Sequence, residues 1–291
     1  MITDTATEVF EEHRPVLTGV AYRMLGRIAD AEDVVQEAWL RWSGTDRDAV
    51  REPRAYLVRV TTRLAIDRLR QLRARNESYV GPWLPEPYLT DFGDTVPDAA
   101  EQAMLADSVS LAVLVVLESL SPLERAVFVL REAFGYPFAE IAATLDRSEA
   151  AVRQLAARAR RHVDERRPRY DVDPAQRRGL TERFLAASAE GDLDGLMRLL
   201  APDVRLVGDS GGHAKAPLRI LETAGKVGRF LVGVAGRLPE GTIRFLEVNG
   251  APTLLFLVDG KPDTAVQLDV FEGRVSCVYI IRNPQKLTFL P

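Results

Sequence analysis

The chain has 291 residues, 46% of them hydrophobic, which is enough for two or three domains with buried cores. Its single cysteine, Cys277, excludes an intramolecular disulfide framework and fits a reducing compartment. No apolar run approaches the roughly 18 to 20 residues that cross a bilayer, and the acidic N-terminus is unlike a signal peptide, so we expect a cytoplasmic protein that does not bind membranes.

The net charge of −4 conceals an uneven distribution along the chain. Residues 51–75 carry eight arginines against two acidic residues, and residues 147–169 carry eight against three. Between these two blocks, residues 76–124 carry nine acidic residues and no lysine or arginine. Two basic blocks favour binding to a polyanion such as nucleic acid. The alternative for either block alone is a solvated helix face.

Three helices are predicted in the first 75 residues. Apolar residues recur at helical spacing over 17–25 and 31–39, and Asp30 is a candidate N-cap for the second helix. A third helix is expected from about Pro53 to Arg75, since a proline is tolerated in the first turn. One edge of this helix, within about 40° at 100° per residue, suits phosphate groups and consists of Arg59, Arg63, Arg70 and Arg73.

A linker at 76–107 contains the sequence GPWLPEP at 81–87. Each proline fixes its own φ and pushes the preceding residue towards an extended conformation, so the segment is stiff and non-helical. A stiff segment that presents Trp83 and Leu84 can dock on a partner surface at low entropic cost, and we expect it to dock on the C-terminal part of the chain. The alternative is that Trp83 packs on the preceding helices and merely ends them.

Residues 136–163 have the spacing of a helix-turn-helix. Ser148 is a good N-cap for the second helix, and Asp146 stands at the turn, where an aspartate tolerates the left-handed region better than most residues. The alternative is an ordinary helical hairpin. The small core of the two crossed helices is supplied by Ile141, Leu145, Val152 and Leu155. Arginine suits guanine or phosphate and glutamine suits adenine; the candidate DNA-binding residues are Ser148, Glu149, Arg153, Gln154, Arg158 and Arg161.

Beyond Asp173 the pattern changes to helices at about 174–189 and 192–200, followed by short β-type runs with hairpin turns such as Asn249-Gly250. Asp209 and His213 could form a proton-transferring pair, but their stretch, DSGGH, is rich in glycine. The strands add few other polar groups, mainly Gln267 and Asp269. We therefore expect no catalytic residue, no metal ion and no cofactor.

Three stretches resemble regions two and four of an extracytoplasmic-function sigma factor of the sigma-70 superfamily: DAEDVVQEAWLRW (30–42), RAYLVRVTTRLAIDRLR (54–70) and SPLERAVFVLREAFGYPFAEIAATLDRSEAAVRQLAARARRH (121–162). The resemblance covers about 1–167. It implies that the protein binds core RNA polymerase and recognises promoters.

The same resemblance implies roles for individual segments. The loop around Ser43–Arg54 would open the minus-ten element and hold an unstacked base, while the helix-turn-helix would read the minus-thirty-five element. For Trp39 the alternative to a contact with polymerase is that its side chain simply packs in the core. The residues that the resemblance assigns to polymerase binding are Asp33, Gln36, Glu37 and Trp39.

The C-terminal part resembles a SnoaL-like, nuclear-transport-factor-like α+β cone, whose pocket could hold a small ligand; GDLDGLMRLLAPDVRLVGD (191–209) is its most characteristic stretch. A subgroup of these sigma factors carries this extension with a WLPEP linker, a DGGGK-like loop and an NPDKL stretch. Here the loop is altered to DSGGH, with Lys215 displaced. The resemblance implies that the extension regulates the sigma factor through Trp83, Leu84, Pro85, Glu86 and Pro87, through Asp209, Gly211 and Gly212, and through Asn283, Pro284, Lys286 and Leu287.

The expected fold is thus multidomain, with an all-α N-terminal half of two helical sigma domains and an α+β C-terminal cone. The expected domains are region two at 1–75, the linker at 76–107, region four at 108–168 and the cone at 174–291. The expected function is promoter-specific transcription initiation regulated by the chain's own C-terminal domain. The alternatives are a stand-alone helix-turn-helix regulator whose cone senses a small molecule, and a cyclase or isomerase with a DNA-binding appendage.

Overall fold

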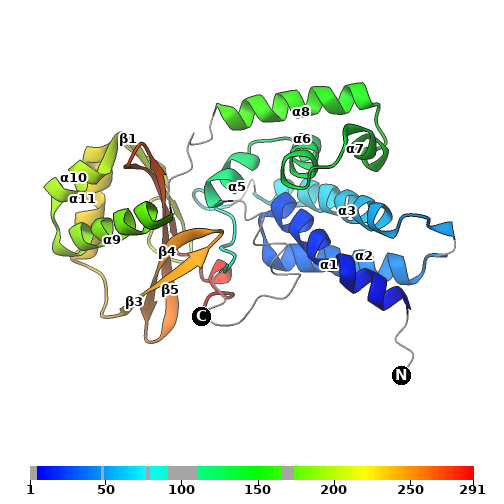
Figure 1. The fold of residues 1–291 in the computed structure, drawn as a ribbon. Helices are drawn as coiled ribbons and strands as arrows, with labels where there is room; N and C mark the ends of the chain where they lie inside the picture. The colour runs from blue at the N-terminus through cyan, green and yellow to red at the C-terminus, as the bar shows by residue number, and fades with distance from the viewer. Residues whose placement is uncertain (1–4, 47–48, 77–78, 91–109, 166–173) are drawn as a thin grey trace. The chain divides into compact units, whose positions relative to one another are not determined.

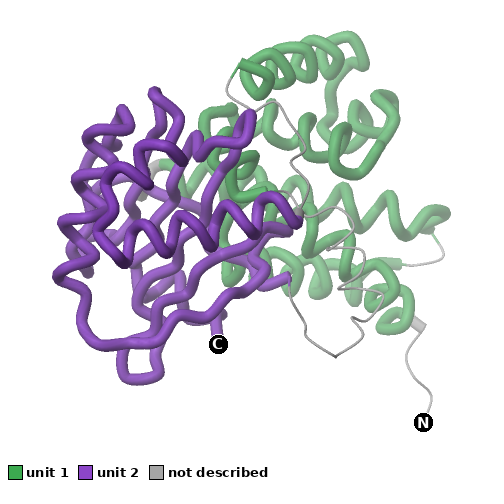
Figure 2. Tube along the Cα trace, turned by 60° about the vertical axis from the view of Figure 1, so that its left-hand side comes forward, with its two compact units in different colours: residues 1–77, 92–166 green, residues 78–91, 167–291 purple. Residues whose placement is uncertain are grey.

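The computed structural model describes residues 5–46, 49–76, 79–90, 110–165 and 174–291. The chain forms two compact units, the first of residues 1–77 and 92–166 and the second of residues 78–91 and 167–291 (Figure 2). The segment with the WLPEP sequence therefore belongs to the C-terminal unit. Within the described residues, none of the helices is both long and apolar enough to cross a membrane.

The first unit begins with three packed helices (Figure 1): α1 (Thr5–Leu25), α2 (Ile28–Ser43) and α3 (Pro53–Asn76). Trp42 of α2 is buried, and its indole nitrogen donates to the carbonyl of Ala6 on α1 over 2.9 Å. The expectation that Asp30 caps α2 is wrong, because this helix starts two residues earlier with Arg27 at the cap position. The Asp30 carboxylate lies in the first turn and accepts a 2.7 Å hydrogen bond from Nε of Arg68 on α3.

The second half of the first unit consists of α5 (Leu111–Leu117), α6 (Pro122–Phe128), a π-helical turn η2 (Val129–Ala133), α7 (Phe138–Leu145) and α8 (Glu149–Asp164). Ser121 and Glu124 form a capping box that starts α6. Asp146 ends α7 in the left-handed region with φ 55°, and Ser148 caps α8 by accepting from the backbone nitrogen of Ala151 over 3.2 Å. The predicted helix-turn-helix geometry is confirmed at both positions.

A completely buried arginine, Arg125 of α6, connects the two halves of this unit. Its Nε donates to the carbonyl of Arg23 near the end of α1 over 3.0 Å, and its Nη1 donates to Glu118 over 2.5 Å. The carbonyls of a last helical turn have no partner within the helix, so a guanidinium satisfies one of them here.

The second unit is a six-stranded sheet with helices on one face (Figure 1). The helices are α9 (Pro174–Glu190), α10 (Leu193–Leu199) and α11 (Ala224–Ala235), and a short 3-10 turn, η3 (Pro284–Lys286), follows the last strand. The strands are β1 (Leu200–Asp209), β2 (Leu221–Glu222), β3 (Thr242–Val248), β4 (Ala251–Val258), β5 (Lys261–Phe271) and β6 (Arg274–Ile281), in the spatial order β2-β1-β6-β5-β4-β3. The expected α+β class is confirmed.

Strands β3 to β6 form an antiparallel meander, as their hairpin turns predict. Asn249, Asp259 and Glu272 each precede a glycine, and all of these residues have positive φ, as two-residue hairpins require. One pair among the described strands departs from the antiparallel pattern, because β1 runs parallel to β6. β1 enters from α10 and is followed by β2, with which it pairs antiparallel, and then by α11. Its parallel partner β6 comes only after the meander, because parallel strands cannot be joined by a tight hairpin.

The core of the second unit fills the space between the three helices and the sheet. Gly228 of α11 allows that helix to approach closely, since a Cβ there would lie 2.9 Å from a methyl group of Leu193. The buried residues of this core are Leu180, Phe184, Ala187, Leu196, Leu200, Ala201, Val204, Leu206, Ala224, Val227, Leu268, Val270, Val275, Val278 and Ile280.

Candidate functional site

A buried aspartate at the end of β1 is the centre of a site that binds the linker. Asp209 is completely buried and accepts hydrogen bonds from three groups. They are the backbone nitrogen of Leu84 (2.7 Å), the hydroxyl of Tyr79 (2.5 Å) and Nζ of Lys286 (2.6 Å). Two of the three donors thus come from the linker and the third from the C-terminal turn η3, so we call the set Asp209, Lys286, Tyr79 and Leu84 the clamp.

Lys286, in the turn η3 after the last strand, also binds the linker. Its ammonium group also donates to the carbonyl of Leu84 and lies 4.0 Å from the ring centre of Trp83 and 5.2 Å from that of Tyr79. An ammonium has three donors and no acceptor, and a cation over an indole or phenol ring is attracted to it. The lysine is only 3% exposed. The carboxylate, the carbonyl and the two rings therefore take the place of the water that would hydrate its ammonium group.

The loop after Asp209 fits closely around the linker. Gly211 has φ +56°, and a Cβ at this position would lie 2.6 Å from Nδ2 of Asn283 and 2.9 Å from the hydroxyl of Tyr79. That same Asn283 nitrogen donates to the Tyr79 hydroxyl over 2.9 Å. Gly212, with φ +81°, faces Val80 at ordinary contact distance. Position 211 therefore requires glycine for both its conformation and its space.

A second anchor holds the linker four residues further along. Tyr88 donates from its backbone nitrogen to Oδ1 of Asn249 (3.1 Å), and the backbone nitrogen of Asn249 donates to the Tyr88 carbonyl (2.8 Å). Thr90 donates from its backbone nitrogen to the carbonyl of Glu247 over 2.8 Å, and Leu89 forms a bridge with Val248. The linker thus adds a short strand to the end of β3, the mode by which extended peptides bind sheet edges.

The structure brings together the three stretches that the sequence analysis associated with regulation. Leu84, Pro85 and Pro87 are buried and Trp83 and Glu86 are half-buried. Asn283, Lys286 and Leu287 are buried, whereas Pro284 is exposed. Sequence reasoning missed Tyr79, Tyr88, Thr90 and Asn249. For Asn249 the hairpin signal Asn-Gly explained the residue without any second role, and nothing in the sequence marks the other three.

Asp209 and His213 do not act as a pair in this structure. The Asp209 carboxylate is occupied by the clamp, and His213 is exposed on the loop that follows. Gln267 donates to the Val248 carbonyl (2.7 Å) and to Thr253 (2.8 Å), which gives it a structural part in the sheet. Burial raises the pKa of Asp269 to about 6, and the charge of Arg177 opposes this effect.

The expected small ligand in the cone stays a prediction. The apolar core described above fills the described interior between helices and sheet. An open groove of about 420 Å³ lies beside α9 and the β5–β6 hairpin, lined by Gln176, Gly179, Leu180, Arg183, Val270 and Gly273.

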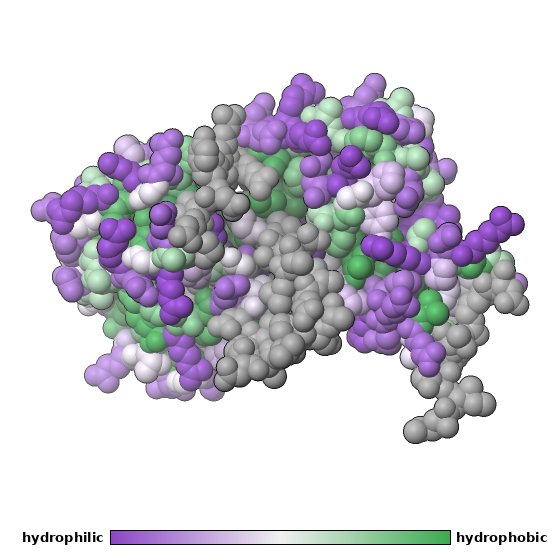
Figure 3. Space-filling model, in the orientation of Figure 1, coloured by the Kyte–Doolittle hydropathy of each residue, from purple (hydrophilic) through white to green (hydrophobic). Residues whose placement is uncertain are grey.

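In the first unit, the helix-turn-helix presents α8 with most of its polar side chains exposed (Figure 3). Arg153 is paired with Glu149 one turn earlier (2.5 Å). Arg158 is paired with Glu124 of α6 (3.0 Å) and Arg160 with Glu132 of η2 (2.6 Å), so these two fasten α8 to the helices beneath it. Gln154 and Arg161 are exposed.

Glu124 is a well-satisfied partner for Arg158. Burial alone would raise the pKa of this carboxyl, but hydrogen bonds from Ser121 and Arg158 outweigh it and lower the pKa. The pairing therefore persists over the neutral pH range, and Arg158 contributes to the fold of region four.

Two arginines on the arginine edge of α3 donate hydrogen bonds to the helices that follow in the first unit. Nε of Arg63 donates to the carbonyl of Thr144 at the end of α7 over 2.9 Å, and Arg73 donates to the carbonyls of Leu120 and Glu118. Arg59 lies 5.5 Å from the ring of Tyr56, and Arg70 is paired with Asp67 (3.0 Å). Two of the four predicted phosphate ligands are thus hydrogen-bonded to helix-end carbonyls.

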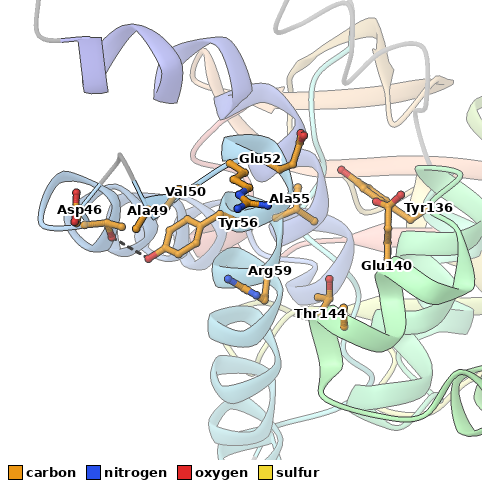
Figure 4. A pocket seen from close by; sticks show the side chains of 14 residues that line it. Asp46, Ala49, Val50, Glu52, Ala55, Tyr56, Arg59, Tyr136, Glu140 and Thr144 are labelled. Atoms are coloured by element: carbon orange, nitrogen blue, oxygen red, sulfur yellow. Dashed lines mark hydrogen bonds between the residues drawn. The ribbon is translucent and has the colours of Figure 1, made fainter.

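A cavity of about 530 Å³ lies between the start of α3 and α7 (Figure 4). Tyr56 and Arg59 line it from α3, and Glu140 and Thr144 line it from α7. The Tyr56 hydroxyl is hydrogen-bonded to Thr45 over 2.9 Å. The loop expected to hold an unstacked base borders this cavity, although residues 47–48 of that loop lie outside the described residues.

The residues assigned to polymerase binding lie on α2. Asp33, Gln36 and Glu37 are exposed, with Asp33 3.6 Å from Arg68 and Glu37 paired with Arg41 at 2.7 Å. Trp39 is half-buried and makes an edge contact with the ring of Phe10 at 5.1 Å between ring centres. Trp39 thus has one part in the core and one part available to a partner.

Comparisons with known proteins agree with this organisation. Two family models match the chain, Sigma-70 region 2 over residues 9–75 and Sigma-70, region 4 over residues 110–163. The ECF RNA polymerase sigma factor SigJ of Mycobacterium tuberculosis is 44% identical over 97% of this chain and 93% of its own length. The probable ECF RNA polymerase sigma factor SigI of the same organism is 33% identical over 98% of this chain and 95% of its own length.

The architecture of the whole chain also has a counterpart among solved structures. The crystal structure of the Mycobacterium tuberculosis extracytoplasmic function sigma factor SigJ matches with a TM-score of 0.79 at 40% identity. The match covers 97% of this chain and 98% of that chain, so it includes the C-terminal unit.

Proposed function

The chain belongs to the extracytoplasmic-function RNA polymerase sigma factors, and from that premise we propose that its C-terminal unit controls promoter-directed initiation by holding the linker between regions two and four. The observation that carries the proposal is the clamp, in which Asp209 and Lys286 bind both the amide and the carbonyl of Leu84. A second anchor at Tyr88 and Thr90 fixes the direction of the segment.

The physical basis is the position of the linker in the chain. The helix α3 of region two ends at Asn76 and the first clamp residue is Tyr79, while α5 of region four starts at Leu111. Regions two and four reach different promoter elements, so the segment that joins them sets which separations are available to them. A domain that holds residues 79–90 restricts those separations, and its release widens them.

The contact is suited to reversible binding. The linker is held mainly by backbone hydrogen bonds, by the hydroxyl of Tyr79 and by the rings of Trp83 and Tyr79 beside Lys286, and these are contacts that a competing partner can replace. Net contributions of single hydrogen bonds are about 0.5–1.5 kcal/mol, and a few of them in two anchors give a docked state that binding to polymerase can oppose.

For core polymerase we propose docking through α2. The exposed carboxylates of Asp33 and Glu37 and the amide of Gln36 suit a basic helical surface, and the free edge of Trp39 would supply apolar area. This activity belongs to the cytoplasm, where core polymerase works.

For promoter DNA we propose that α8 reads the minus-thirty-five element and that the arginine edge of α3 contacts phosphates. Arg63 and Arg73 must then exchange helix-end carbonyls for phosphate oxygens. Both acceptors carry negative charge density, and the phosphate carries more of it. Binding to promoter DNA is therefore expected to favour separation of the two halves of the first unit.

The experiment combines transcription with hydrogen exchange on the full-length protein. The variant Tyr79→Phe/Trp83→Ala removes the hydroxyl bound by Asp209 and the ring bound by Lys286, and it changes no residue of regions two and four. Exchange at the amides of Leu84 and Thr90 should accelerate at least about tenfold, because the docked linker protects them. Initiation by core polymerase on a selected promoter should change severalfold, in the same direction as in the protein truncated after Tyr170.

Two further variants serve as controls for the Tyr79→Phe/Trp83→Ala variant. His213→Ala alters an exposed side chain of the adjacent loop and should leave exchange and transcription unchanged. Truncation after Phe289 removes the buried Leu290 but keeps Lys286, so it separates the effect of the last two residues from that of the clamp. Faster linker exchange combined with unchanged initiation in the Tyr79→Phe/Trp83→Ala variant would show that docking has no regulatory role.

A further inference from the structure

The geometry points to Arg153 as the side chain that reads a guanine in the minus-thirty-five element, and we propose that Phe138 and Glu149 are the residues that position it. The inference rests on the proposed role of α8 in promoter recognition. It goes beyond that role by assigning the base and the two supporting side chains.

The guanidinium of Arg153 is held by two groups from different helices. The carboxylate of Glu149, one turn earlier on α8, accepts from Nε over 3.1 Å and from Nη2 over 2.5 Å. The ring of Phe138, the first residue of α7, lies 4.6 Å from the guanidinium carbon. Arginine stacks on aromatic rings through its planar, weakly hydrated group, so the ring and the carboxylate together fix both the position and the plane of the fork.

Phe138 is itself supported. The guanidinium carbon of Arg131, on η2, lies 4.8 Å from the same ring centre, and Nη1 of Arg131 donates to the Tyr136 carbonyl over 3.0 Å. The ring is thus held between the scaffold of region four and the recognition helix. Phe138 is half-buried, while the Arg153 side chain remains 60% exposed.

The arrangement leaves the end of the Arg153 fork available. Glu149 occupies the Nε side, and among the described residues no hydrogen bond to Nη1 is present. The paired terminal nitrogens of an arginine match the O6 and N7 acceptors of guanine in the major groove. Arg153 lies in the first half of α8, the part of a recognition helix that contacts base edges.

The other arginines of α8 do not share this geometry. Arg158 and Arg160 are paired with Glu124 and Glu132 of the supporting helices, and Nε of Arg161 points to the carbonyl of Ala157 on its own helix. An unsupported arginine must lose its rotamer freedom on binding, whereas the side chain of Arg153 is already restricted by the carboxylate of Glu149 and the ring of Phe138. Arg153 is therefore the arginine of this helix that is best prepared for specific reading, and Arg161 suits a phosphate.

The test uses full-length protein with core polymerase and a promoter library randomised over the minus-thirty-five element, with sequencing of the transcribed templates. The wild type should prefer guanine at one position at least. Arg153→Ala should reduce that preference about 5- to 150-fold, the range of 1–3 kcal/mol expected for a bidentate pair. The other positions should keep their preferences.

The positioning role is tested by variants that leave Arg153 in place. Phe138→Leu and Glu149→Ala should each relax the same guanine position, by about three- to tenfold, and should leave the salt dependence of binding unchanged. Phe138→Tyr keeps the ring and Glu149→Gln keeps an acceptor, so both should restore most of the preference. Thermal unfolding of each variant separates a folding defect from a loss of specificity.

Arg161→Ala is the matched control on the same helix. It should weaken all templates uniformly and lower the salt slope by about one, as expected for a phosphate contact. The proposal is overturned if Arg153→Ala behaves like this control, or if folded Phe138→Leu and Glu149→Ala variants keep the guanine preference of the wild type. Transcription by the wild type without any guanine preference would also overturn it, while leaving the function as a sigma factor intact.

Discussion

Both units bury a charged side chain completely, but they satisfy it in different ways. Asp209 of the second unit has a cation, a hydroxyl and a backbone amide around its carboxylate. Arg125 of the first unit has one carbonyl and one carboxylate, and its Nη2 has no hydrogen-bond partner among the described residues. The clamp that holds the linker is therefore saturated, whereas the connection between regions two and four is not.

This difference indicates which junction separates first. A buried charge with every position occupied is costly to expose one partner at a time, because each step leaves the others unsatisfied. The Arg125 junction already tolerates one unmet nitrogen, and Glu118 is partly exposed, so water can replace its partners with a smaller penalty. Regions two and four should accordingly move apart more readily than the linker leaves the C-terminal unit.

The largest expected effect tests the saturated side of this comparison. Lys286→Met leaves the buried Asp209 carboxylate without its cation and should lower the free energy of unfolding of the second unit by about 3–5 kcal/mol. Urea denaturation followed by hydrogen exchange in the second unit measures it. The double variant Asp209→Asn/Lys286→Met should recover part of the loss, because the amide leaves no buried charge and its oxygen can still accept from Leu84. A loss below about 1 kcal/mol for Lys286→Met would contradict the comparison.

Asp269 provides a third case, a carboxylate whose burial outweighs the attraction of Arg177. Burial raises its pKa to about 6, against 3.8 for the unfolded reference. Because the pKa of this carboxyl is higher in the folded than in the unfolded state, the folded protein binds the proton more tightly. The ionised group therefore destabilises the fold above pH 6, and this destabilisation disappears as the pH falls and the carboxyl becomes protonated. At 1.36 kcal/mol per unit, the shift destabilises the fold by about 3 kcal/mol at pH 8, and most of this effect, about 2.5 kcal/mol, is lost by pH 4.

The variant Asp269→Asn removes this titration. It should be more stable than the wild type at pH 8 by about 2–3 kcal/mol, and the difference should shrink towards zero near pH 4. Parallel unfolding curves for the two proteins across this range provide the measurement. A constant difference would mean that another group titrates.

A smaller loss of stability is expected at Arg125, whose hydrogen-bonding groups are not all satisfied. Arg125→Met fills a similar volume and removes the charge, and it should cost only about 1–2 kcal/mol in the first unit, less than Lys286→Met in the second. The exposed pair of Arg160 and Glu132 is the reference for a surface contact, and Arg160→Met should cost about 0.5 kcal/mol or less. If Arg125→Met proves more costly than Lys286→Met, the order of separation inferred above is reversed.

A modest effect is expected at the second anchor of the linker. Thr90→Val keeps the backbone hydrogen bond to Glu247 but removes the hydroxyl that accepts from the Gly250 nitrogen over 3.0 Å. It should cost about 1 kcal/mol and accelerate exchange at Tyr88 and Thr90 more than at Leu84. Equal acceleration at all three amides would show that the two anchors open together.

Local chemistry made much of the fold predictable. Ser121 and Ser148 are N-caps because their side chains accept from nearby amides, and Asp146 adopts the left-handed turn without glycine; all of these depend on a few neighbouring residues. The hairpins of the sheet were predictable for the same reason. The recurring stretches of the resemblance located both sides of the linker contact, although not its atoms.

Features that depend on distant partners were not predictable. The helix α11 was not predicted because its glycines weaken the helical signal. Only the position of Leu193 explains why Gly228 is needed. Tyr79 carries a hydroxyl that matters only because Asp209 and Asn283 reach it. Asp30 satisfied the rule for a cap but binds Arg68, whose position the sequence pattern does not reveal.

The distance along the chain between the partners of the clamp has a consequence in time. Leu84 and Lys286 are 202 residues apart, and Lys286 is translated well after the helices of regions two and four. Regions two and four are complete at Asp164, so at 5–20 residues per second they precede the clamp by roughly 6 to 25 s. Every newly made molecule therefore passes through a period in which regions two and four exist and the clamp does not.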